Sequence, residues 1–161
     1  MSDTGYTKAP AETNLSTTNG PKDDANFKLD ERLAADSFWL ASWPLCELRR
    51  FDDQRYAWLM LVPRRADMTE FVDLSEADQV QLAREIKRAS EMLLQDARQR
   101  QQKVKLNVGA LGNVVSQLHI HVLLRQPNDP AWPGPVWGHS AALRFAAAQQ
   151  QQELTRWQAL L

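Results

Sequence analysis

The sequence has very few cysteines and no excess of charge of either sign. Cys46 is the only cysteine among 161 residues, which rules out an intrachain disulfide or a multi-cysteine metal site. Twenty acidic residues stand against 19 basic ones and leave a formal net charge of −1. Such a balance argues against the strong basic field of a protein that binds nucleic acid or a membrane surface.

Long apolar runs are also lacking. None approaches the ~20 residues that span a bilayer, and the first residues have neither the basic nor the apolar region of a signal peptide. We therefore expect a cytoplasmic protein whose partners include no nucleic acid and no membrane.

The remaining composition predicts one globular domain behind a polar tail. The length suits a single domain, and 43% of the residues are hydrophobic. Residues 1–26 are rich in Thr, Asn, Ser and Pro, with Leu15 as their only branched aliphatic residue, so we expect a disordered tail there. Residues 27–161 form the predicted domain, with a core at about 39–138 and a C-terminal helix at about 140–160.

Hydrophobic patterning in the first half of this domain predicts a hairpin after a short helix. Residues 27–43 carry apolar residues at mixed spacing, which favours a short helix followed by a turn. Residues 45–51 alternate like a strand, and 52–55 supply turn residues. Residues 56–62 are apolar on both faces and stop at Pro63, so we expect a central, fully covered strand.

A long helix is expected next, from Glu76 to about Arg98. Ser75 begins a capping box in which Asp78 reaches back to the first free amide. Apolar residues then recur at steps of four, three and four, which places them on one helix face: Leu82, Ile86, Ala89 and Leu93.

The second half predicts two more strands and a final helix. Residues 103–108 alternate, with Val104, Leu106 and Val108 on the buried side and Asn107 on the polar side. A loop containing Gly109 and Gly112 separates them from a second alternating strand, 117–124, and apolar residues predict the last helix from about Ser140. Hairpin strands with segregated helices give an α+β domain on an antiparallel sheet.

Three polar residues share one face of the strand at 117–124. Side chains two apart point the same way, so Gln117, His119 and His121 are expected in line, about 7 Å apart. A neutral imidazole can attack phosphorus and form a phosphohistidine, while a second, cationic imidazole and loop amides stabilise the phosphoryl oxygens. The pair therefore suits phosphoryl transfer.

A His-x-His pair on a strand also occurs without catalysis. The two side chains could be partly exposed structural histidines, or they could bind a metal ion. A three-histidine zinc site would need His139 as well, and thus every histidine in the chain. The spacing alone does not decide between these alternatives.

The sequence of this region resembles a known family. The segment NVGALGNVVSQLHIHVLLRQ is similar to the signature of the histidine triad (HIT) superfamily, in which three histidines alternate with apolar residues after a glycine loop. The resemblance extends to AWLMLVPR upstream and AWPGP downstream, and covers about Trp39 to Gly138. It implies a HIT-like fold, with one long central helix and a C-terminal helix.

The resemblance also implies an activity and a site. HIT proteins are nucleotidyl hydrolases and transferases that act on purine nucleoside phosphoramidates or dinucleoside polyphosphates, usually as homodimers and without a catalytic metal or other cofactor. His119 matches the nucleophile and His121 the histidine that holds the phosphate. The positions that match the family's phosphate cradle are Asn107, Gly112, Asn113 and the backbone of Val114.

This chain departs from the family pattern at three positions. Gln117 replaces the first motif histidine, and its amide can form hydrogen bonds but cannot carry a proton at pH 7. Trp58 stands where the family often has a further histidine, and Val114 stands where a hydroxyl often assists the phosphate. The sequence therefore predicts a nucleotide hydrolase or transferase, with a catalytically weakened nucleotide-binding module as the alternative.

Overall fold

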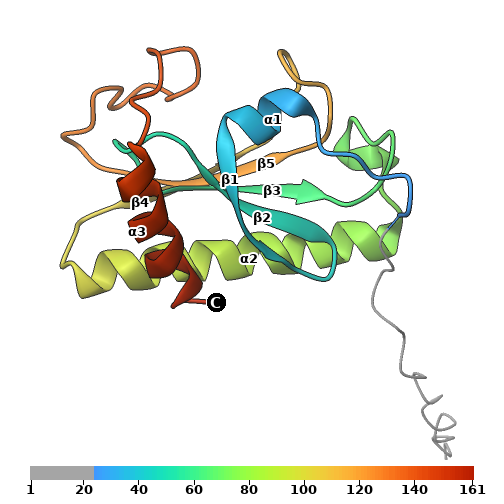
Figure 1. Ribbon diagram of the computed structural model, residues 1–161, viewed down its shortest axis with the longest axis horizontal. Coiled ribbons are helices and arrows are strands. Elements are labelled where there is room, and N and C mark those ends of the chain that lie inside the picture. The colour runs from blue at the N-terminus through green and yellow to red at the C-terminus, as the bar shows by residue number, and fades with distance from the viewer. Residues whose placement is uncertain (1–23) are drawn as a thin grey trace, which may run out of the picture.

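The computed structural model of the chain describes residues 24–161. Its elements are α1 (Glu31–Ala35), β1 (Ser37–Ser42), β2 (Cys46–Phe51), β3 (Trp58–Pro63), the 3-10 turn η1 (Phe71–Asp73), α2 (Glu76–Gln99), β4 (Lys105–Gly109), β5 (Ile120–Arg125) and α3 (Ala147–Gln158). The strands form one antiparallel sheet in the order β1-β2-β3-β5-β4. Figure 1 shows α2 running along one side of this sheet and α1 on the other. The predicted α+β fold is confirmed.

Strand β3 forms the middle of the sheet, as its unbroken apolar sequence predicts. Every residue from Trp58 to Pro63 is buried, because β2 and β5 flank the strand and both sheet faces are covered. In the antiparallel register, Met60 pairs with His121 and Trp58 pairs with Leu123. Paired residues share a sheet face, so the histidine strand and the central strand present their side chains together.

The chain before β2 differs from the prediction of a helix and a turn. The helix is only the short α1, capped by Asp30, whose side chain accepts from the Arg32 amide. Residues 37–42 instead form the edge strand β1, which pairs with β2 across a bulge. Pairing with a partner distant in sequence decides this segment, and its mixed local spacing has no period of two that would reveal it.

Helix α2 has the predicted bounds but a different cap. Ser75 Oγ accepts from the Asp78 amide at 3.2 Å, as expected for an N-cap. The Asp78 carboxylate does not reach back to the first amide; it binds Arg65 through two hydrogen bonds of 2.7 and 2.8 Å. The apolar stripe faces the sheet, with Leu82, Ala89 and Leu93 fully buried.

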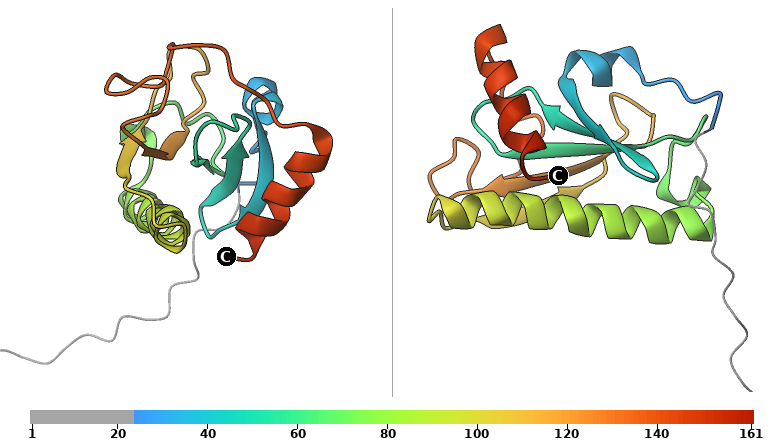
Figure 2. Two further views of the ribbon diagram at one scale, coloured as in Figure 1. Left: turned by 90° about the vertical axis from the view of Figure 1, so that its left-hand side faces the viewer. Right: turned by 60° about the horizontal axis from the view of Figure 1, so that its bottom comes forward.

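The last helix begins later than predicted. Residues 140–146 are not helical, and α3 starts at Ala147. The backbone before it is held by tertiary bonds: Asp52 accepts from the Phe145 amide at 3.0 Å, and the Gln54 amide donates to the Leu143 carbonyl at 2.9 Å. Figure 2 shows α3 beside β1 at the sheet edge, where its Trp157 is fully buried.

The N-terminal segment and the strand β4 differ in part from what the sequence predicts. Most of the predicted tail lies outside the described residues; within its last part, Asp24 accepts from the Ala66 amide at 3.1 Å. Val108, expected on a buried face, is 46% exposed, because β4 is an edge strand.

Across residues 24–161 we find no helix that combines the length and apolar character needed to cross a membrane.

A buried carboxylate joins α2 to the start of β2. Glu85 is 3% exposed and accepts from the backbone amides of Leu45 and Cys46 at 2.8 and 2.9 Å. It also accepts from the Gln81 side chain at 2.9 Å. Buried amides need such acceptors, since no water reaches them.

We expect Glu85→Ala to destabilise the fold. The substitution leaves two buried amide donors unsatisfied, at about 1–3 kcal/mol for each group, so urea denaturation should give a free energy of unfolding at least ~2 kcal/mol lower. Glu91→Ala is the matched control, because Glu91 lies on the same helix in an exposed pair with Lys87. That control should change stability by less than ~1 kcal/mol. Equal effects from both substitutions would contradict this role of Glu85.

Candidate active site

A cavity of about 600 Å³ opens on the sheet face opposite α2. Its walls come from α1, the turn between β2 and β3, the loop before β5, β5 itself and the chain after it. Among the residues that line it are Leu33, Phe51, Asp53, Tyr56, Trp58, Asn113, Val114, His119, His121, Trp137 and Arg144. A second cavity, of about 670 Å³, is lined by Gln117 and residues near α1 and contains no imidazole.

His119 lies just before β5 and is held by the backbone. The residue is 6% exposed, and its Nδ1 lies 2.7 Å from the carbonyl oxygen of Gln117. A carbonyl can only accept a hydrogen bond, so Nδ1 must carry the proton. In the neutral ring, the other nitrogen, Nε2, then keeps its lone pair.

His121 has the opposite arrangement. The Trp58 indole Nε1 lies 3.0 Å from His121 Nδ1, and an indole N–H can only donate. Nδ1 must therefore accept, which leaves the ring proton on Nε2. Burial, and secondarily the neighbouring His119, lowers the pKa of His121 from 6.5 to about 3. The expected cationic second imidazole is thus wrong: His121 is a neutral N–H donor at pH 7.

The two imidazoles lie together within an aromatic wall. Their ring centroids are 4.9 Å apart with the planes nearly perpendicular, at 89°. Phe51 stacks on Trp58 at 4.2 Å, and the Trp137 ring lies 5.7 Å from His121. This apolar shell keeps water from the rings and accounts for the lowered pKa of His121.

Gly109 makes room for Trp137. A Cβ added at Gly109 would lie 3.0 Å from the Trp137 ring, so the indole rests directly on the backbone of β4. Trp137 therefore belongs to the cavity wall. Trp132, from the same Pro-rich segment, is instead 40% exposed and lies over the Arg125 guanidinium.

The rim of the cavity carries paired charges that the sequence reasoning missed. Asp53 is 2% exposed and binds Arg55 through hydrogen bonds of 2.9 and 2.6 Å. Arg55 also donates to the Ser140 hydroxyl at 2.7 Å, and this bond links the chain after β5 to the turn between β2 and β3. Arg144 pairs in a similar way with Asp36 and Asp52. An Asp two residues before an Arg in a predicted turn was the available signal.

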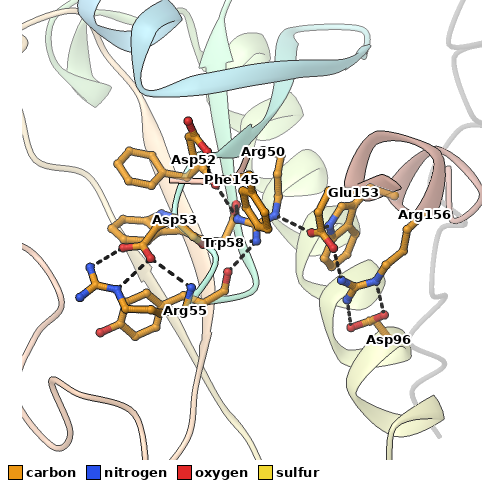
Figure 3. A network of polar contacts seen from close by, with 12 residues as sticks. Arg50, Asp52, Asp53, Arg55, Trp58, Asp96, Phe145, Glu153 and Arg156 are labelled. Carbon is orange, nitrogen blue, oxygen red and sulfur yellow. Dashed lines mark hydrogen bonds and ion pairs between the residues drawn. The ribbon is translucent and has the colours of Figure 1, made fainter. Parts of the chain in front are cut away.

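Arg50 holds this turn from inside the protein. Its guanidinium is almost fully buried and donates to the carbonyls of Phe51, Tyr56 and Trp58 at 2.6, 2.8 and 3.2 Å. Figure 3 shows the same side chain reaching Glu153 of α3, whose carboxylate lies 3.2 Å away. The backbone that carries Trp58 is therefore fixed by a buried ion pair.

Glu153 extends the network to α2. It accepts from the Trp157 indole at 2.9 Å and from Arg156 at 2.6 Å. Arg156 also binds Asp96 of α2, as Figure 3 shows. The turn between β2 and β3 and the helices α2 and α3 thus share one chain of charged hydrogen bonds.

The structure brings together four of the seven predicted site residues. His119, His121, Asn113 and Val114 line the cavity, whereas Asn107, Gly112 and Gln117 do not. Asn107 pairs with Leu123 on the same sheet face as His121, farther along β4. Val114 is 79% exposed, and its carbonyl accepts from Arg32 at 2.6 Å.

Gln117 does not lie in line with the imidazoles. Its side-chain Nε2 donates to the Lys28 carbonyl at 2.8 Å, and its Oε1 accepts from the Asp30 amide at 2.9 Å. The residue precedes β5, so strand alternation does not govern its direction. Its side chain ties the N-terminal segment in place, while its carbonyl orients His119.

The third histidine lies apart from the other two. His139 is exposed in the loop before α3, not at the helix start, and its Nδ1 is 3.2 Å from the Ser140 hydroxyl. It does not line the cavity, so the three-histidine zinc site is not assembled. Within the described part of the chain, no three His, Cys, Asp or Glu side chains are grouped to hold a metal ion.

A family model described as the HIT domain matches residues 32–128, which include both imidazoles and their loop. The chain belongs to the HIT family. Proteins of this family bind and hydrolyse nucleotides, in agreement with a cavity built around two histidines.

Solved histidine triad proteins from three bacteria share the fold of this HIT protein. The one from Sinorhizobium meliloti is 38% identical, with a TM-score of 0.75 over 84% of this chain and 98% of its own. Those from Bradyrhizobium japonicum and Marinobacter aquaeolei are 39% and 37% identical, with TM-scores of 0.75 and 0.74. They cover 83% and 84% of this chain and each spans 96% of its own. No curated protein matches the chain.

We expect burial of neutral His121 to make stability fall in weak acid. Its pKa is about 3 when folded and near 6.5 when unfolded, so between these values the unfolded chain binds more protons. The stability that goes with a neutral, buried His121 is fully present above pH 6.5 and is lost as the pH falls toward 3. In that range the free energy of unfolding should fall by up to about 1.4 kcal/mol per pH unit.

Urea denaturation at several pH values between about 5 and 7 checks this slope, since most carboxylates stay ionised there. His121→Gln removes the titrating group, so its free energy of unfolding should depend less on pH than that of the wild type. Parallel pH profiles for the two proteins would show that His121 does not titrate differently on folding.

Proposed function

We propose that this HIT protein hydrolyses or transfers the phosphoryl bond of a purine nucleotide through a phosphohistidine on His119. One observation carries the proposal: two buried imidazoles with opposite tautomers line the same cavity. His119 offers a lone pair on Nε2, and His121 offers a proton on Nε2. A nucleophile and a neutral donor for the phosphoryl oxygens are the two groups that this chemistry needs.

The reaction would proceed in two displacements. His119 Nε2 attacks phosphorus, the bond from phosphorus to the leaving group breaks, and the leaving group takes the electron pair. Water then attacks the phosphohistidine, the bond to Nε2 breaks with its electrons returning to nitrogen, and a proton passes to solvent. The Nδ1 proton stays on its hydrogen bond to the Gln117 carbonyl, which keeps the ring correctly oriented throughout.

The remaining predicted residues have supporting roles in this proposal. The backbone at Gly112, Asn113 and Val114 would approach the phosphate beside His121, and Asn107 would complete the polar side of β4. Gln117 would act by fixing His119 and the segment around Asp30, since its amide faces away from the cavity. The aromatic wall of Phe51 and Trp137 suits a purine base.

The substrate that we propose is a purine nucleoside phosphoramidate or a dinucleoside polyphosphate, and the reaction needs no cofactor. We also infer a cytoplasmic location, which suits the single cysteine: Cys46 is fully buried, and burial raises the pKa of its thiol. A second candidate is a nucleotide-binding module with little turnover. The replacement of two family histidines by Gln117 and Trp58 favours that alternative.

His119→Ala tests the proposal most directly. Incubation with an adenosine or guanosine phosphoramidate and with a dinucleoside polyphosphate should release nucleoside monophosphate only with an intact His119. Because the imidazole acts mainly in the transition state, nucleotide affinity should stay within about tenfold, or ~1.4 kcal/mol. His139→Ala, which changes the exposed histidine, should keep wild-type turnover.

Each outcome is decisive for one candidate. Equal turnover in His119→Ala and wild type excludes this nucleophile. Absence of turnover in the wild type, with micromolar nucleotide binding retained, favours the binding module.

We further propose that the protein forms a homodimer through the free edge of β4. The strand has a neighbour only on the β5 side in the described chain, and Val108 leaves 46% of its surface exposed there. An unpaired edge with an exposed apolar residue offers backbone groups for pairing with a second copy.

Val108→Lys tests this interface. A charge at the strand edge opposes pairing, so sedimentation should shift from a dimer for the wild type to a monomer for the variant. Ser42→Lys, at the other sheet edge in β1, is the control and should sediment like the wild type. A dimer that survives Val108→Lys, or a monomeric wild type, would contradict this proposal.

A further inference from the structure

Trp58 differs from the other cavity residues because its indole N–H points at one of the two imidazoles. The residue is 4% exposed, and its Nε1 is 3.0 Å from His121 Nδ1. Phe51 stacks on the indole, and the Trp137 and Tyr56 rings meet it edge-on, each with ring centroids 6.1 Å away. Arg50 binds the Trp58 carbonyl. The donor is therefore held in place from several directions.

We propose that Trp58 is a positioning residue that fixes His121 as a neutral Nε2–H donor, and so restricts the site to leaving groups that depart as anions. This inference rests on the proposed function. It goes beyond that function because it states which leaving groups the site can release: those that depart without taking up a proton.

The indole N–H of Trp58 can donate a hydrogen bond but cannot accept one. A histidine at this position could give a proton to its neighbour or take one from it, whereas the Trp58 N–H donates a hydrogen bond and exchanges no proton at neutral pH. As long as this bond persists, His121 Nδ1 cannot be protonated. His121 could then give up its Nε2 proton only by becoming an anion, which a buried ring disfavours strongly.

The groups that face His121 are aromatic or already engaged. Phe51, Trp58 and Trp137 surround its ring and carry no titratable acid. The His119 Nδ1 proton is bound to the Gln117 carbonyl, and the Gln117 side chain is turned away toward residues 28–30. None of these groups can pass a proton to His121.

The acidic and basic groups on the cavity wall do not supply a proton either. Asp53 accepts from Arg55, and Asp36 pairs with Arg144, so both carboxylates are in ion pairs. The Tyr56 phenol is a weak acid whose pKa burial raises further. Among the described residues that line the cavity, no unpaired carboxyl group is thus placed to protonate a departing group, and the Nε2 atom of His119 is itself the nucleophile.

The chemistry then divides possible substrates into two classes. When His119 Nε2 bonds to phosphorus and the bond to the leaving group breaks, a phosphate or an acidic phenol can carry the electron pair away as a stable anion. An amine cannot leave as an anion and must receive a proton as the bond breaks. The site should therefore cleave nucleotide anhydrides and acidic esters far better than phosphoramidates.

A leaving-group series measures this restriction. We would follow single-turnover release from adenosine 5′-monophosphate aryl esters, ranging from a nitrophenyl ester to the unsubstituted phenyl ester, and from a matched phosphoramidate. With wild type, the rate should fall by about a hundredfold or more from the most to the least acidic phenol, the usual size of a missing proton transfer. In Trp58→His the same fall should shrink to less than about tenfold.

A spectroscopic measurement distinguishes an effect of Trp58 on the His121 tautomer from a general effect on the fold, and it does not require enzymatic activity. Nitrogen-15 NMR of the ligand-free protein should show the His121 proton on Nε2 alone in the wild type. Trp58→Phe removes the donor and keeps an apolar ring in its place, so both neutral tautomers of His121 should appear. Trp43→Phe is the matched control, because Trp43 is 5% exposed in the core cluster on the α2 side of the sheet. It should leave the His121 signals unchanged.

The outcomes distinguish this inference from the proposed function. Equal rates along the ester series and for the phosphoramidate would overturn the leaving-group restriction while leaving the nucleophile intact. A His121 proton on Nδ1, or unchanged signals in Trp58→Phe, would overturn the positioning role. Failure of the wild type to cleave any substrate would overturn the proposed function together with the restriction, and the spectrum alone would then decide the role of Trp58.

Discussion

The buried guanidinium of Arg50 is the interaction on which the geometry of the site depends. It donates hydrogen bonds to carbonyl groups on both sides of the turn between β2 and β3, and it forms an ion pair with Glu153 of α3. A buried cation without its partner is costly, typically by about 3–5 kcal/mol, so the turn and the helix are stable only together. The apolar core around Trp157 then holds the helix against the sheet.

The surrounding fold sets the tautomer of each imidazole in the site. The turn places Trp58 at the start of β3, and the sheet register brings β5 alongside, so the indole meets His121. His119 is set differently, by a backbone carbonyl two residues earlier. Two neighbouring rings of the same residue type thus present a lone pair and a proton to one cavity, because their partners differ in what they can donate.

Much of the fold could be predicted because local patterns agreed with it. The apolar run of β3, the spacing on α2 and the alternation near the histidines each have one dominant period. The strand β1 and the late start of α3 escaped prediction, since hydrogen bonds to residues distant in sequence decide them. Arg49 of β2 donates to Ser37, and Asp52 accepts from the Phe145 amide. In the site, the sequence placed His119 and His121. It did not predict the direction of Gln117 or the neutral state of His121, which depend on distant partners and on burial.

The two hydrogen bonds between the Gln117 amide and the backbone of Lys28 and Asp30 constrain how this position can change. The same residue supplies the carbonyl that orients His119 and the amide that anchors the chain before α1. Gln117 therefore has a structural role at both its side chain and its backbone. Replacement by histidine would therefore release the anchored segment as well as add an imidazole, so the chemistry of a three-histidine site could not be gained by that single change.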